Sequence, residues 1–255
     1  MNQGGALPWS PARIALQGVG VLVAMLLWEF LGQSGTLGRA LPALSAVLEY
    51  AAQPRASDLL LRATAATASA AALGFLIGAL SGILIAGLAV LAPLLHRGLD
   101  QLSAFINAIP LIALGPVLIV TVGRDATPVA IAALTVFFGV YVATAAGLAG
   151  TRRSATDLFR SLGASRFDTL LRLQLPSAVP RIVDGLRLTA SAAIVGAILG
   201  EWFGAPAGIG LLIVSSMQNF QIELLWSAAL AGVLLSVLAF ALFGVLQRWT
   251  EARFQ

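Results

Sequence analysis

Cysteine is absent from this chain of 255 residues, and histidine occurs once, at His96. Without cysteine the chain forms neither a disulfide nor a thiolate metal site. A single histidine argues against a metal cluster built on imidazole ligands. Charged residues are scarce too, at 10% of the chain, against about a quarter in ordinary soluble domains. There are too few polar residues to cover a soluble globule of this size.

Hydrophobic residues, by contrast, make up 59% of the chain. The apolar segments run for about 20 residues each, which is the length of a membrane-spanning helix and not that of the alternating strands of a membrane barrel. The fold class is therefore an all-α polytopic membrane protein, with one transmembrane domain over residues 1–255. Its first apolar stretch, from Ile14 to Leu31, is longer than the core of a signal peptide and no cleavage pattern follows it, so we expect a retained helix.

Six spans and two shorter elements are expected along the chain. The spans cover 13–32, 60–91, 99–122, 127–150, 181–203 and 225–246. The amphipathic segment 41–53 suits a helix lying at the interface. Gly208 to Met217 is apolar but too short to cross, which favours an interfacial or re-entrant helix. Glu29 stands near the outer end of the first span, where we interpret it as an interfacial carboxylate rather than a proton relay.

The arginines indicate the orientation. A formal charge of +4 with every basic residue an arginine is typical of the positive-inside bias in a membrane protein, and we do not expect a nucleic-acid partner. With the N-terminus inside, eleven arginines lie on the cytoplasmic side: Arg13, Arg97, Arg152, Arg153, Arg160, Arg166, Arg172, Arg181, Arg187, Arg248 and Arg253. Four lie outside: Arg39, Arg55, Arg62 and Arg124. Both termini and the polar loop 151–180 are then cytoplasmic.

Small residues and breaks mark individual helices. Gly74, Gly78 and Gly82 form a face that allows close approach of another helix in lipid. The span 99–122 is interrupted by Asn107, Pro110 and Gly115-Pro116; breaks at membrane depth line translocation pathways or are plain proline kinks, and both interpretations stay open for Pro110. Asn107, Pro110 and Glu201 are the pathway candidates. At the start of the fifth span Arg181, Asp184 and Arg187 are spaced to neutralise one another.

No catalytic or nucleotide-binding motif is present, and His96 has no partner that the sequence identifies. The polar loop does carry a pattern. Gly163-Ala164-Ser165 is followed, ten residues after the glycine, by Leu173-Gln174-Leu175-Pro176. Asp157 stands six residues before the glycine, followed by Leu158 and Phe159. Two short amphipathic patterns flank Gly163, and Pro176 and Pro180 are expected to end the second.

This loop resembles the EAA motif of ABC-importer permeases, with Leu158 and Phe159 in place of the two alanines. Other segments are similar to permeases of the nitrate, sulfonate and taurine type: Leu41 to Val47 with Leu44 replacing a proline, Ala108-Ile109-Pro110, Gly200-Glu201-Trp202 and Gly208-Ile209-Gly210.

The resemblance implies a non-catalytic permease subunit in a bacterial inner membrane. It implies a second permease subunit, in a homodimer or a close heterodimer, two cytoplasmic ATPase subunits and a periplasmic or lipid-anchored binding protein. ATP and magnesium would bind the partner ATPase, with no cofactor in this chain. The ATPase would grip the loop around Asp157, with Leu158, Phe159 and Leu162 as the apolar contact, Gly163 as the turn, Arg160 and Arg166 as charge contacts, and Pro176 as the exit.

Two alternatives belong to other classes. A self-contained secondary transporter or channel would need a coupling carboxylate, for which Glu29 and Glu201 are the candidates near the spans, and no inverted repeat is evident. A membrane enzyme would need a nucleophile–base or metal-ligand pattern, which the sequence lacks. The nearly uncharged interior of the spans favours a small organic solute, neutral or aromatic, over an anion.

Overall fold

The computed structural model describes the backbone of residues 11–36 and 38–254, and the side chains of residues 16–250 apart from those of residues 17, 37 and 39. Arg13, Arg39 and Arg253 of the expected charge asymmetry lie outside the described side chains. Every regular element in the described part is helical. In chain order the elements are α1 (Pro11–Ser34), η1 (Gly38–Ala40), α2 (Leu44–Ala52), α3 (Pro54–Leu91), α4 (Pro93–Ala108), α5 (Leu111–Val122), α6 (Thr127–Ala149), α7 (Arg153–Ser161), α8 (Arg166–Thr169), η2 (Leu170–Gln174), α9 (Leu175–Glu201), α10 (Ile209–Gln218) and α11 (Ile222–Phe254).

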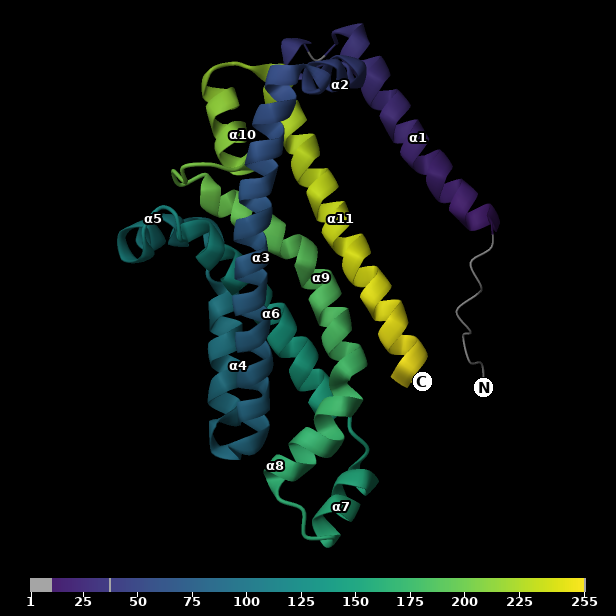
Figure 1. Cartoon of the computed structure of the whole chain (residues 1–255), viewed down its shortest axis with the longest axis vertical. Coiled ribbons are helices and arrows are strands. Elements are labelled where there is room, and N and C mark those ends of the chain that lie inside the picture. Colours follow the sequence, from purple (N-terminus) through teal and green to yellow (C-terminus); the bar gives the residue numbers. More distant parts are fainter. Residues whose placement is uncertain (1–10, 37, 255) are drawn as a thin grey trace.

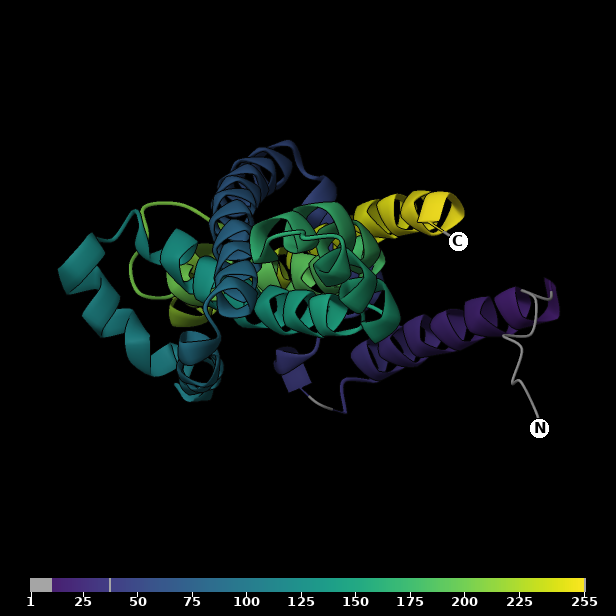
Figure 2. The same cartoon turned by 90° about the horizontal axis from the view of Figure 1, so that it is seen from below.

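Within the described residues, four helical stretches are long and apolar enough to cross a membrane, and the bent pair α4–α5 makes a fifth if counted as one span. The apolar part of α1, Gly18–Ser34, falls just short of that length. Figure 1 shows α3, α6, α9 and α11 forming the bundle, with α7 and α8 at one end, here called the loop end, and α2 at the opposite end. Viewed from below, α1 and α5 project from opposite sides of the bundle (Figure 2).

Glycines hold α3, α6 and α9 together. A β-carbon on Gly78 would lie 2.4 Å from the Ala133 carbonyl oxygen of α6, and one on Gly74 would lie 2.5 Å from the Ala132 β-carbon. On the α9 side, a β-carbon on Gly200 would lie 2.5 Å from the Pro128 α-carbon. Such close backbone approach replaces hydrophobic driving force in lipid. The expected packing role of the small-residue faces is confirmed.

The span expected over 99–122 is two helices. α4 begins at Pro93, and the chain bends by 97° between α4 and α5. Ile109 and Pro110 are extended, with Pro110 serving as the N-cap of α5. The residue before a proline disfavours the helical conformation, which accounts for the position of the break. Pro116, by contrast, stays inside α5, so the interruption expected at Gly115-Pro116 does not occur.

The expectation that Pro176 and Pro180 end the second amphipathic helix is wrong. α8, η2 and α9 form one helical stretch from Arg166 to Glu201, 36 residues long. The π turn of η2, Leu170–Gln174, precedes Pro176, which occupies the first turn of α9. A proline there loses only an N–H that has no helical partner, and the wider π turn absorbs its ring.

Side chains of α1 and α11 fasten the end opposite the loop. The Glu29 carboxylate accepts hydrogen bonds from the Ser45 backbone N–H at 2.9 Å and from the Ser45 hydroxyl at 2.6 Å, at the start of α2. Trp28 donates to the Pro42 carbonyl at 3.1 Å, and Trp226 of α11 donates to the Ala40 carbonyl at 3.0 Å. The two indole rings lie 5.0 Å apart. Glu29 therefore caps the start of α2.

Candidate functional site

α7 and α8 form a helical hairpin that projects from the loop end of the bundle (Figure 1). None of the residues of α7 is buried. Leu158 is 57% exposed and Leu162, directly after the helix, is 76% exposed, while Phe159 and Ala164 are half-buried. An apolar ridge on an otherwise polar helix is a surface that a partner protein can cover.

Gly163 ends α7 in a left-handed turn. Its φ is +81°, a conformation that glycine adopts without steric cost. The Gly163 N–H donates to the Arg160 carbonyl at 3.0 Å, and the Ala164 N–H donates to the Phe159 carbonyl at 3.0 Å. This pair of bonds is the Schellman motif, which satisfies the last carbonyls of the helix. A β-carbon on Gly163 would touch nothing within 4 Å, so the backbone conformation alone requires glycine.

Ser165 begins the next helix. Its side-chain oxygen accepts a hydrogen bond from the Asp168 backbone N–H at 3.1 Å, as an N-cap does. Its hydroxyl donates to the Asp168 carboxylate. The expected sequence Gly163-Ala164-Ser165 thus places a helix stop and a helix start within three residues, which fixes the angle of the hairpin.

Charged groups surround the hairpin, and all of them except the partly buried Asp168 are well exposed. Arg160 lies 3.9 Å from Asp157, and Arg172 lies 3.8 Å from Asp168. Exposed pairs of this kind contribute little to stability. Arg160 and Arg166 also line a polar cavity of about 160 Å³ between α7, α8 and the end of α3. The arginines are therefore available for a partner.

Buried contacts tie the hairpin to the bundle. Leu170 packs with Leu148 of α6 and with Ala178 and Ile182 of α9. Leu173 and Leu175 are half-buried on the same stretch, whereas Pro176 is exposed. The Arg181 guanidinium donates to the Ala146 carbonyl of α6 at 3.1 Å. The hairpin is thus packed against both α6 and α9.

The expected neutralisation among Arg181, Asp184 and Arg187 is not direct. Within the described side chains, Gln247 of α11 bridges the last two: its amide nitrogen donates to Asp184 at 2.7 Å and its oxygen accepts from Arg187. The Arg187 guanidinium carbon also lies 4.2 Å from the centre of the Phe240 ring. These contacts join α9 to α11, and the spacing along one helix gave no indication of them.

The three pathway candidates, Asn107, Pro110 and Glu201, lie in different elements. Asn107 is exposed near the end of α4, and Pro110 opens α5 at the bend. Glu201 is only 1% exposed and contacts the start of α10. The place of all three residues on a pathway stays a prediction.

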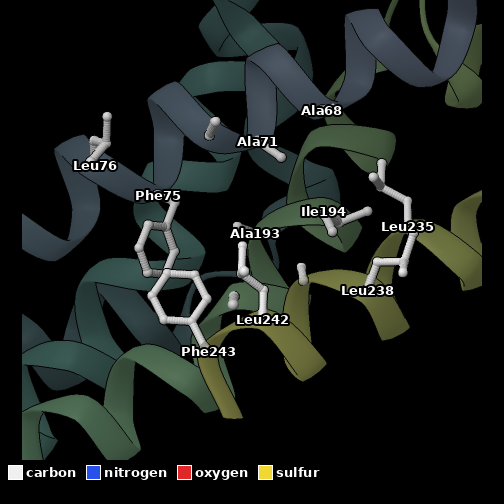
Figure 3. Close-up of a pocket in the computed structure, with 13 residues that line it drawn as sticks. Ala68, Ala71, Phe75, Leu76, Ala193, Ile194, Leu235, Leu238, Leu242 and Phe243 are labelled. Atoms are coloured by element: carbon white, nitrogen blue, oxygen red, sulfur yellow. The ribbon is translucent and has the colours of Figure 1, made fainter. Parts of the chain in front are cut away.

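Two features had no sequence signal. Tyr141 of α6 donates a hydrogen bond to Asp100 of α4, and His96 lies 3.7 Å from that carboxylate, so the lone histidine does have a partner. A groove of about 470 Å³ lies between α3, α9 and α11 and is lined only by apolar residues. Figure 3 shows Phe75 and Phe243 closing one end of it. Such a groove offers no group for chemistry.

The fold and the hairpin define a polytopic helical membrane protein with an exposed, partly apolar loop at one end. Residues 74–255 match the family model of binding-protein-dependent transport system inner membrane components, and the chain belongs to that family. A probable ABC transporter permease of Haemophilus influenzae is 30% identical over 91% of this chain and 94% of its own length. The formylaminopyrimidine transport permease ThiX of Halalkalibacterium halodurans is 32% identical over 69% of this chain and 71% of its own.

A solved structure shares the fold. The inward-facing methionine ABC transporter MetNI aligns with a TM-score of 0.67 at 16% identity, covering 78% of this chain and 99% of that one. The chain is thus the membrane-embedded permease component of an ABC importer, and the relatives that it matches are named as permease proteins.

Proposed function

We propose that the α7–α8 hairpin is where a cytoplasmic ATPase drives this permease. The observation that carries the proposal is the exposed pair Leu158 and Leu162 on a polar helix, held at a fixed angle by the turn at Gly163. The ATPase covers the ridge, and Arg160 and Arg166 make charge contacts at its rim. ATP and magnesium bind the ATPase, and this chain carries no cofactor.

The proposed route of the movement is the long helix that follows the hairpin. The stretch from Arg166 to Glu201 has 36 residues, which at 1.5 Å each span about 54 Å. It begins at the hairpin and ends against α10, beyond the middle of the bundle. Closure of the ATPases tilts this helix together with α6, which exposes the pathway alternately to the two sides.

We further propose that two copies form the pathway. Leu94, Leu102 and Phe105 of α4 and Val120 of α5 are exposed apolar side chains on the bent pair, and a second copy covers them. The hairpin and both termini face the cytoplasm, α1 supplies the sixth span, and a binding protein docks at the end that carries α2. The protein lies in a bacterial inner membrane.

The proposed cargo is a small organic solute. Arg124 precedes α6, and Arg187 in the middle of α9 is already held by Gln247 and Phe240 of α11. We therefore do not expect either arginine to guide an anion. The relative ThiX is named for formylaminopyrimidine and another relative, RibX of Chloroflexus aurantiacus, for riboflavin. Glu29 and Glu201 are both occupied as acceptors of backbone N–H groups, which disfavours ion coupling through either carboxylate.

The test replaces the turn glycine in the full complex of permease, ATPase and binding protein. Gly163→Asp strains the turn and adds a charge to the surface facing the ATPase; Gly35→Asp is the matched control, because its φ of +65° is similar and a β-carbon there also meets nothing within 4 Å. We expect both variants to insert in the membrane, and only Gly163→Asp to abolish ATP hydrolysis stimulated by the binding protein. Full stimulation in Gly163→Asp would refute the assignment of this loop.

A further inference from the structure

Glu201 is the last residue of α9, and three elements enclose it. Its side chain is among the largest fully buried ones, at 1% exposure. One carboxylate oxygen accepts a hydrogen bond from the Gly210 backbone N–H of α10 at 2.7 Å. Beside it, the buried Thr67 hydroxyl of α3 accepts from the Ile209 backbone N–H at 2.8 Å. A buried carboxyl in an apolar bundle is costly unless it is bonded in this way.

The connection between α9 and α10 is shaped around that carboxyl. A β-carbon on Gly208 would lie 2.2 Å from the Glu201 carboxyl carbon, and the φ of Gly208 is +133°. A β-carbon on Gly210 would lie 2.3 Å from the Ile198 carbonyl oxygen. The segment Gly208-Ile209-Gly210 therefore makes the room that the Glu201 side chain occupies.

Glu201 and Thr67 together replace the missing cap of α10. Gly208 is the N-cap residue of α10 and has no side chain to accept a hydrogen bond. The first N–H groups of a helix have no partner within the helix. Ile209 and Gly210 supply two of those groups, and their acceptors come from α3 and α9. The start of α10 is thus held by two helices of the bundle.

Those two helices belong to one tightly packed unit. α3 and α9 both approach α6 with glycines in contact with its backbone, Gly78 on one side and Gly196 and Gly200 on the other. Gly200, next to Glu201, meets Pro128 at the first turn of α6. Movement of the unit at the loop end is therefore carried to the residue that holds α10.

We infer that Glu201 is a positioning residue that locks α10 to α9, so that α10 moves with the helix driven by the ATPase. The inference rests on the proposed function of the hairpin. Figure 1 shows α10 rising from the end of α9 toward the end that carries α2, on the side proposed to meet the binding protein. The link makes α10 the element that reports the state of the ATPases to that side, and the state of the binding protein to the ATPases.

The test uses the whole complex in lipid nanodiscs, with ATP hydrolysis measured without and with saturating binding protein. In Glu201→Ala we expect basal hydrolysis within about twofold of wild type and stimulation reduced at least about fivefold, the lower end of ordinary coupling between sites. Glu201→Gln keeps an acceptor for the Gly210 N–H and should retain most of the stimulation. Glu223→Ala is the matched control, because Glu223 is an exposed carboxylate in the first turn of α11.

A second readout reports α10 itself. The chain has no cysteine, so a spin label on Met217→Cys, 58% exposed on α10, is the only label present. Its mobility should rise in Glu201→Ala and return toward wild type in Glu201→Gln, while a label on Leu188→Cys of α9 stays unchanged.

Several results would overturn the inference. Normal stimulation in Glu201→Ala, or a label on α10 whose mobility does not rise in that variant, would show that Glu201 does not lock α10 to α9. A parallel fall of basal and stimulated hydrolysis, or loss of the assembled complex, makes Glu201 a residue for folding only. If the wild-type complex shows no stimulation, or if Gly163→Asp keeps full stimulation, the proposed function of the hairpin fails together with the inference. If Gly163→Asp abolishes stimulation and Glu201→Ala does not reduce it, only the inference fails.

Discussion

Truncating the apolar ridge tests how the hairpin holds the ATPase. In the double variant Leu158→Ala/Leu162→Ala both exposed side chains lose all but their β-carbons. Neither leucine packs in a core of this chain, since they are 57% and 76% exposed, so the fold should be kept. Their loss should appear in the affinity for the partner.

The expected loss follows from the exposed area. Complete burial of a leucine side chain contributes about 1.5–3 kcal/mol. Burial of the exposed parts of both leucines is then worth about 2–4 kcal/mol, which corresponds to an affinity about 30-fold to about 900-fold weaker in the variant.

The assay titrates purified ATPase subunit onto the permease in nanodiscs and follows fluorescence anisotropy. Val245→Ala/Leu246→Ala is the matched control, because these side chains are 67% and 40% exposed on α11 and lie outside both the hairpin and the surface proposed to meet the second copy. The control should bind within about twofold of wild type. Unchanged affinity in the Leu158/Leu162 variant, or an equal loss in the control, would refute the reasoning.

Three further predictions concern packing and capping. Gly78→Leu drives a side chain into the α6 backbone, where a β-carbon alone would lie 2.4 Å from the Ala133 carbonyl. The variant should lose more than about 3 kcal/mol of stability and its peak of folded protein in size-exclusion chromatography. Gly98→Leu should keep that peak, because a β-carbon on Gly98 would meet nothing within 4 Å. Glu29→Ala removes the acceptor at the start of α2 and should speed the hydrogen exchange of the α2 amides; unchanged exchange would contradict the capping role. Tyr141→Phe leaves Asp100 without its buried donor and should lower stability by about 1.5–3 kcal/mol, measured as a lower thermal midpoint in detergent; an unaltered midpoint would show that the bond contributes nothing.

Local signals in the sequence predicted the hairpin well. Gly163 and Ser165 act through bonds to residues three to five positions away, so the stop and start of the helices are encoded within a short segment. The small-residue faces of α3 and α9 were also predictable, because close helix packing in lipid requires them. That both faces pack against α6 could be learned only from the structure.

Predictions from prolines and charged residues failed where the local structure depends on contacts with other parts of the fold. Pro176 and Pro180 are expected to break an isolated helix, yet the π turn at Leu170–Gln174 accommodates Pro176, and α9 also continues through Pro180. Glu201 stands near the end of an apolar segment, which suggested an interface. Its actual partners, Thr67 and Gly210, lie on other elements, and no spacing along one helix indicates contacts of that kind.

Photo-crosslinking from position 162 tests the central claim most directly. A photoreactive residue at Leu162, in the intact complex in cell membranes, should capture a protein with the phosphate-binding sequence of an ATPase, identified by mass spectrometry of the crosslinked peptide. The same residue at Leu94 should not. Capture of that ATPase from Leu162 alone is the result the account predicts; no ATPase at Leu162, or equal capture from both positions, would contradict it.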